Sequence, residues 1–209
     1  LYKNPVKTGQ IHYDLLQKNE GFTTAGQVQY AAVGGNFRKA DFEYTGALRI
    51  LKVILSYDYL WINIRVKGGA YGCMSNFRRT GDCFLVSYRD PHLKQTLDVF
   101  RGTPEYLRNF QADEREMTKY IIGTISELDV PMNPSAQGEL ALTAWLSGLG
   151  EEDFQKERDE ILKADQEDIR RLADLIQAVL EQEIICVVGS ESSLEKNREI
   201  LKTVEPLNN

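Results

Sequence analysis

Three consecutive segments predict a pair of strands joined by a turn: Tyr71-Gly-Cys-Met-Ser-Asn-Phe77, Arg78-Arg-Thr-Gly-Asp82 and Cys83-Phe-Leu-Val-Ser-Tyr88. The first and third segments are short, apolar and aromatic, as half-buried strands are. The middle segment supplies the glycine and aspartate that a tight turn favours. The sequence therefore predicts an antiparallel hairpin, and with it a sheet.

Working outward from the hairpin, the upstream sequence predicts one strand and one helix. Apolar residues alternate between Gly26 and Phe37 and lead into Gly34-Gly35-Asn36, which predicts a strand that closes in a turn. Residues 44–63 have apolar side chains at helical spacing and predict an amphipathic helix. Downstream, Asp90-Pro91 predicts an N-cap and a first-turn proline at the start of a helix, and Thr103-Pro104 repeats the device.

The second half of the chain is helical almost throughout. Asp113 with Glu116 forms a capping-box signature, and Asp165 caps a later amphipathic helix. The apolar run over residues 183–189 is too short for a helix and predicts a buried central strand, followed by a helix over 192–201. This order predicts an α+β fold, with an antiparallel or mixed sheet of about four or more strands and helices packed on one face. We expect residues 1–209 to form a single domain with loose ends at 1–20 and 203–209.

Composition excludes several functional classes. The chain has 209 residues, 42% of them hydrophobic, and no window approaches the ~18 consecutive apolar residues of a membrane span. The formal net charge of −6 hides a basic first half and an acidic second half. Basic residues do not alternate with aromatic ones as nucleic-acid-binding proteins require. Three scattered cysteines predict reduced thiols rather than a disulfide framework or a metal knuckle. We expect no nucleic-acid partner and no membrane association.

The motifs of independent catalysis are missing from the sequence. There are two histidines, His12 and His92, and neither begins an H-x-x-E-H or an H-E-x-x-H. There is no G-x-S-x-G, Walker or dinucleotide-binding motif. Both Trp61 and Trp145 fall on helical stripes and are predicted to be core residues. The sequence therefore predicts no metal site, no bound cofactor and no catalytic residue in this chain.

One segment still carries chemistry, namely Arg65-Val-Lys-Gly-Gly-Ala-Tyr-Gly72. Arg65 offers a fork of five donors and Tyr71 one phenol donor, so the pair can bind a carbonyl oxygen or an oxyanion without transferring a proton. The glycines Gly68, Gly69 and Gly72 would let the backbone turn sharply and let a ligand approach. Alternatively, Arg65 pairs with a carboxylate, the Gly-Gly pair makes an ordinary turn and Tyr71 packs in the sheet.

Five blocks in order carry a family resemblance: Tyr59-Leu-Trp61, Arg65-Val-Lys-Gly-Gly-Ala-Tyr-Gly72, Ser87-Tyr-Arg-Asp-Pro91, Thr96-Leu-Asp-Val99 and Thr118-Lys-Tyr-Ile-Ile-Gly-Thr-Ile125. Together they resemble the C-terminal domain of presequence-protease-type enzymes, in the pitrilysin/insulinase family of inverted-motif zinc peptidases. The resemblance runs from about residue 25 to residue 190, which is most of the chain.

The resemblance implies a divided active site. Family members close two halves around a chamber for unfolded peptides, and the zinc, the H-x-x-E-H helix and the general base belong to the N-terminal half. Arg65 and Tyr71 match the arginine and tyrosine that hold the backbone carbonyl of the substrate beside the scissile bond. We therefore expect a fragment of a zinc metalloendopeptidase that is inactive alone, binds no zinc itself, and has the N-terminal half of the same polypeptide and unfolded peptides as partners.

Two other functions remain open at this point. The same fold occurs in inactive structural or assembly subunits, and a free-standing peptide-binding module could use a sheet edge. Retention of both Arg65 and Tyr71 argues against the inactive subunit. The expected location is the bacterial cytoplasm or an organelle matrix, and the sequence does not decide between them.

Overall fold

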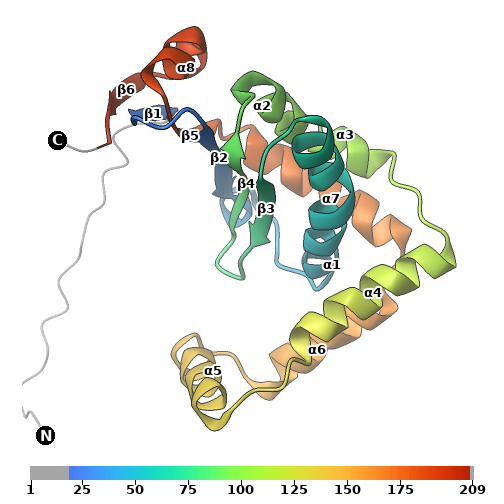
Figure 1. Ribbon diagram of the computed structural model, residues 1–209. Helices are drawn as coiled ribbons and strands as arrows, with labels where there is room; N and C mark the ends of the chain where they lie inside the picture. The colour runs from blue at the N-terminus through green and yellow to red at the C-terminus, as the bar shows by residue number, and fades with distance from the viewer. Residues whose placement is uncertain (1–18, 208–209) are drawn as a thin grey trace, which may run out of the picture.

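A six-stranded mixed sheet forms the centre of the chain in a computed structural model that describes residues 19–207 (Figure 1). The strand order is β3-β4-β2-β5-β1-β6. The strands are β1 (Glu20–Thr23), β2 (Gln29–Asn36), β3 (Gly72–Phe77), β4 (Asp82–Asp90), β5 (Ile184–Gly189) and β6 (Thr203–Pro206). Neighbours from β3 to β5 pair antiparallel, whereas β1 pairs parallel with both β5 and β6. The predicted mixed α+β sheet and its hairpin are confirmed.

Helices cover one face of this sheet. The α-helices are α1 (Ala47–Ile54), α2 (Leu93–Arg101), α3 (Thr103–Arg108), α4 (Glu114–Leu128), α5 (Pro134–Leu146), α6 (Glu151–Lys163), α7 (Gln166–Leu180) and α8 (Glu191–Lys196), and short 3₁₀ turns are η1 (Phe37–Ala40) and η4 (Arg198–Ile200). Alternate strand residues such as Ala31, Leu85 and Val187 are buried under the helices. Their neighbours Met74, Tyr88 and Ile184 are exposed on the opposite face. Residues 19–207 thus leave one face of the sheet open.

The predicted helix over residues 44–63 is longer than expected and changes its winding. After α1 the chain continues through two wider, π-type segments, η2 (Leu55–Tyr59) and η3 (Trp61–Lys67). Wide turns of this kind are rare and are enriched at functional positions. The continuation carries Arg65 to the edge of the sheet, where the chain turns into β3.

Asp90 is not the N-cap that the sequence predicted. It is the last residue of β4, and His92 occupies the N-cap position of α2 without a side-chain bond. The Asp90 carboxylate is buried and accepts hydrogen bonds from the His92 N–H at 2.8 Å and from the Thr96 hydroxyl. It therefore fixes the strand-to-helix corner from a position two residues before the N-cap. The restart at Thr103-Pro104 is confirmed by α3.

Helices α4 and α6 run side by side as an arm that carries α5 at its far end (Figure 1). Asp113 and Glu116 form the predicted capping box of α4. No residue of α5 is buried, and Trp145 is 76% exposed, so the prediction that Trp145 is a core residue is wrong. The apolar stripe of α5 is present, but no described residue covers it.

A buried carboxylate ties this arm to the sheet. Glu157 of α6, which is 4% exposed, accepts hydrogen bonds of 2.5 Å from the Tyr44 hydroxyl, Arg49 Nε and Arg79 Nη2. Arg49 lies on α1 and Arg79 in the turn of the β3–β4 hairpin. Burial raises the pKa of Glu157, but the hydrogen bonds and charges of these partners outweigh burial and leave the pKa lowered. Glu157 is therefore ionised and connects α6 to α1 and to the β3–β4 turn.

The stretches predicted to be loose, 1–20 and 203–209, overlap with two strands at the borders of the described region. Residues 203–206 form β6, the edge strand beside β1, and Glu20 already belongs to β1. These strands are short and pair in parallel with distant segments, so neither has a local turn signal. Residues 1–18 and 208–209 lie outside the described region.

Candidate substrate-binding site

Residues 65–72 form the sharp connection between η3 and β3. The turn is closed by hydrogen bonds from Gly69 N–H to the Arg65 carbonyl at 3.0 Å and from Ala70 N–H to the Ile64 carbonyl at 3.1 Å. Gly69 has φ of 77°, which favours glycine, and a Cβ at Gly68 would lie 2.5 Å from the Ile64 carbonyl oxygen. These two glycines are therefore needed for the turn.

Gly72 has no such steric requirement. It lies in β3 opposite Tyr88, and an added Cβ would meet no atom within 4 Å. The structure therefore provides a physical reason for Gly68 and Gly69 and none for Gly72. The role of Gly72 as part of the supporting loop remains a prediction.

Arg65 ends in an exposed guanidinium that lies over the ring of Trp61, with Cζ 4.0 Å from the ring centroid. The two residues are one helical turn apart, so the indole orients the arginine as a cation–π pair. Within residues 19–207, no carboxylate forms an ion pair with Arg65. Burial raises the pKa of the Cys73 thiol to about 11, and the nearby Arg65 charge opposes this shift. The alternative in which Arg65 pairs with a carboxylate is not what the structure has.

Tyr71 directly precedes β3 and is 67% exposed. Its N–H donates to the carbonyls of Tyr88 at 3.1 Å and Arg89 at 3.3 Å, which fixes its backbone. Its ring meets the Tyr88 ring edge to face, with centroids 5.7 Å apart. Among the described residues, nothing accepts a hydrogen bond from the Tyr71 hydroxyl. The phenol is thus held in place and remains free to donate to a ligand.

Arg65 and Tyr71 lie on either side of the Gly68-Gly69 turn, both exposed, at the same corner of the domain. No hydrogen bond joins the two side chains in the described part of the chain. Each is anchored by its own aromatic neighbour, Trp61 or Tyr88. The corner therefore presents two separate, preorganised donors rather than one bonded pair.

Three further residues of this corner were not singled out as functional from the sequence, namely Tyr30, Tyr88 and Arg89. The Tyr30 and Tyr88 rings meet edge to face at 5.3 Å, and the Arg89 Cζ lies 5.7 Å from the Tyr88 ring and 6.0 Å from the Tyr71 ring. The available signal was Tyr88-Arg89 directly before Asp90-Pro91, at the end of a strand.

For the histidines and cysteines of the described residues, the relevant kinds of site are metal-ligand clusters and reactive thiols. Among residues 19–207, no group of three or more His, Cys, Asp and Glu side chains could hold a metal ion. His92 is exposed at the start of α2, and His12 lies outside the described region. Burial raises the pKa of Cys83 to about 12, so this thiol stays protonated and unreactive at neutral pH.

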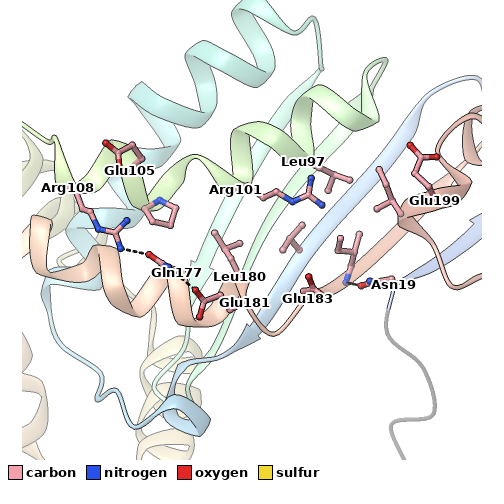
Figure 2. Close-up of a pocket in the computed structure, with 14 residues that line it drawn as sticks. Asn19, Leu97, Arg101, Glu105, Arg108, Gln177, Leu180, Glu181, Glu183 and Glu199 are labelled. Carbon is pink, nitrogen blue, oxygen red and sulfur yellow. Dashed lines mark hydrogen bonds between the residues drawn. The ribbon is translucent and has the colours of Figure 1, made fainter.

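A groove of about 660 Å³ opens between α2, α3, α7 and β5 (Figure 2). It is lined by acidic residues, including Glu105, Glu181 and Glu199, and by Arg108, which binds Asp174 at 3.0 Å. Neither Arg65 nor Tyr71 lines it. Because the groove contains neither of the two predicted donors, the exposed corner is the better candidate site.

None of the helices described between residues 19 and 207 is long and apolar enough to cross a membrane. Residues 19–191 match the family model described as the PreP C-terminal domain. The chain is 46% identical over 202 residues to "Protein HypA" of Clostridium perfringens, covering 97% of this chain and 21% of that protein. It is 34% identical over 198 residues to presequence protease 1, chloroplastic/mitochondrial, of Arabidopsis thaliana, covering 93% and 18%. The chain thus spans about one fifth of the length of these relatives.

Solved structures show the same fold. The inactive domain of an M16 peptidase from Pseudomonas fluorescens superposes with a TM-score of 0.61 at 17% identity, covering 88% of this chain and 46% of that one. Pitrilysin superposes with a TM-score of 0.56 at 14% identity, covering 82% and 19%.

Proposed function

The chain belongs to the PreP C-terminal domain family, and we propose that it is the non-catalytic, substrate-binding domain of a zinc peptidase that degrades unfolded peptides. The observation that carries the proposal is the exposed corner where Arg65 and Tyr71 each present donors that no described residue uses. Two fixed, unpaired donors on a domain without a metal cluster in its described part fit a site completed by another part of the polypeptide.

The chemistry of this chain is carbonyl binding. The Arg65 guanidinium and the Tyr71 hydroxyl donate hydrogen bonds to the carbonyl oxygen beside the scissile bond, or to the oxyanion that develops there. Trp61 and Tyr88 hold the two donors in place before substrate arrives, so little orientation is lost on binding. The described residues of this chain do not fit a zinc site, so the zinc and the H-x-x-E-H motif are expected in the N-terminal half of the same polypeptide.

Exposed apolar surface supports that N-terminal half as the partner. On α5, Leu142, Trp145 and Leu146 are 57%, 76% and 70% exposed. On the open sheet face, Met74 is 53% exposed. Exposed apolar side chains grouped on one helix, as on α5, are typical of a contact face. Because the chain spans about one fifth of its relatives, the missing remainder of the polypeptide is the occupant we propose.

The proposal is tested by Tyr71→Phe and Arg65→Ala in the intact peptidase. Removing one donor to an oxyanion typically costs about 3 kcal/mol, so kcat/KM for a long unfolded peptide should fall about 100-fold while zinc content is unchanged. Tyr57→Phe is the matched control, because Tyr57 is also an exposed tyrosine (68%) and lies on η2 outside this corner. Unchanged kcat/KM in both site variants would refute the role.

The same fold in an inactive assembly subunit would not require the two donors to be fixed and exposed together, which favours the substrate-binding function over that alternative. For the location we propose the bacterial cytoplasm or an organelle matrix. The Arabidopsis relative is named as chloroplastic/mitochondrial, and other relatives are mitochondrial presequence proteases.

A further inference from the structure

Strand β4 contains a bulge next to Tyr71. Gln29 pairs with Asp90 and Ala31 pairs with Ser87, so Tyr88 and Arg89 together face the single residue Tyr30 of β2. Arg89 has φ of 49°, in the left-handed region. Bulges of this kind normally place glycine there, because a side chain on that backbone is strained. An arginine at this position has a conformational cost that glycine would avoid.

The surrounding structure holds Arg89 in this conformation. The Arg89 carbonyl accepts from Tyr71 N–H at 3.3 Å, and the Asp90 carbonyl accepts from Gln29 Nε2 at 3.3 Å. The buried Asp90 carboxylate then anchors the corner through the His92 N–H at 2.8 Å. None of these bonds uses the Arg89 side chain. The backbone would therefore keep its shape with glycine at this position, and the arginine must be explained by what its side chain does.

The Arg89 side chain is exposed and surrounded by tyrosines. The rings of Tyr71 and Tyr88 lie 6.0 and 5.7 Å from its Cζ. The pKa of the guanidinium is raised, first by a hydrogen bond with Tyr30 and then by the nearby Tyr88 and Tyr30. No carboxylate of residues 19–207 forms an ion pair with it. A cation with free donors, bordered by phenols that can also donate, is complementary to a carboxylate.

We propose that Arg89, with the hydroxyl of Tyr88, binds a carboxylate of the substrate peptide close to the scissile bond. The proposal rests on the function proposed above for Tyr71. An extended peptide advances about 3.3 Å per residue. Arg89 Cζ lies 6.0 Å from the centroid of the Tyr71 ring, so we place the carboxylate within about two residues of the carbonyl that Tyr71 binds. The carboxylate belongs either to an acidic side chain at that position or to the C-terminus of the peptide.

Two pairs of peptides test this proposal in the intact peptidase. The first pair differs only by glutamate or glutamine two residues from the cleaved bond, and the second only by a C-terminal acid or amide at the same distance. The unmodified enzyme should cleave the carboxylate member of at least one pair with about tenfold higher kcat/KM. Preference within the first pair identifies side chains as the source, and preference within the second identifies the C-terminus.

Arg89→Gly should abolish the preference. Arg78→Gly, which removes an exposed arginine from the opposite end of the same hairpin, should keep it. The 209-residue chain with Arg89→Gly should unfold at the same or a higher temperature than the unmodified chain, because glycine relieves the left-handed backbone. A lower unfolding temperature would show that the arginine serves the fold and would overturn the proposal.

The outcomes separate this proposal from the one on which it rests. If Tyr71→Phe lowers kcat/KM but neither peptide pair is discriminated, or Arg89→Gly still discriminates, the carboxylate site is wrong and the carbonyl site stands. If Tyr71→Phe has no effect while Arg89→Gly abolishes the preference, Arg89 binds carboxylates and the carbonyl role of Tyr71 is wrong.

Discussion

Replacing Glu157 by glutamine should loosen the arm from the sheet. The carboxylate is 4% exposed and accepts three hydrogen bonds of 2.5 Å, two of them from arginines. Glutamine converts one acceptor oxygen into a donor that faces an arginine, so at least one charge-assisted bond is lost. Such a bond contributes about 1.5–3 kcal/mol, and breaking a buried pair costs up to about 5 kcal/mol.

Solvent exposure of the two arginines reduces this free-energy cost. The side chains of Arg49 and Arg79 are 39% and 28% exposed, so water partly replaces the lost bonds. We expect Glu157→Gln to lower the free energy of unfolding by about 2–3 kcal/mol at pH 7. Urea unfolding of the 209-residue chain, followed by far-ultraviolet circular dichroism, measures the change. Glu152→Gln on the same helix is the control, because Glu152 is exposed and should change stability by less than about 0.5 kcal/mol.

The pH dependence gives a second check. Because the folded-state pKa of Glu157 is lowered, its stabilisation is fully present above the ordinary glutamate pKa of about 4.3 and is lost as the pH falls through the lowered value. The difference between the unmodified chain and Glu157→Gln should therefore be constant from about pH 6 to 8 and shrink below about pH 4. If Glu157→Gln lowers the free energy of unfolding at pH 7 by no more than Glu152→Gln does, Glu157 does not stabilise the fold in this way.

Three other measurements test separate parts of the structure. The purified chain should contain no stoichiometric zinc by elemental analysis, and one zinc per chain would contradict the divided site. Gly46→Ala should cost about 1–3 kcal/mol in urea unfolding, because the new Cβ would lie 2.6 Å from the Glu157 carbonyl oxygen. Because Trp145 is 76% exposed, Trp145→Ser should leave the urea unfolding midpoint unchanged and reduce self-association in sedimentation velocity. A lower unfolding midpoint would mean that Trp145 packs inside the domain.

The sequence predicted those parts of the fold that local signals determine. The β3–β4 hairpin follows from the turn residues 78–82 between two apolar segments, and the α4 boundary from the capping box of Asp113 and Glu116. The edge strands β1 and β6 were missed, because short strands that pair in parallel with distant segments leave no local pattern. Trp145 was placed wrongly, because an apolar helical stripe looks the same whether it packs inside the chain or against another part of the polypeptide.

The candidate site was also only partly predictable. The residue types in Arg65–Tyr71 indicated carbonyl binding, and the turn at Gly69 needs the residue that the sequence provides. Arg89 was not singled out, because its sequence signal, Tyr88-Arg89 directly before Asp90-Pro91, does not indicate the left-handed backbone at Arg89. Only the pairing of β2 with β4 shows that Arg89 lies in a bulge of the sheet.

The role proposed for Tyr71 of this domain is to donate a hydrogen bond to the carbonyl oxygen as it becomes an oxyanion. Its most direct test is the inhibition constant of a phosphinic peptide, whose tetrahedral oxygens mimic that oxyanion, in the intact peptidase with and without Tyr71→Phe. We expect the inhibitor to bind the variant about 100-fold more weakly, in proportion to the loss in kcat/KM. An unchanged inhibition constant would contradict it.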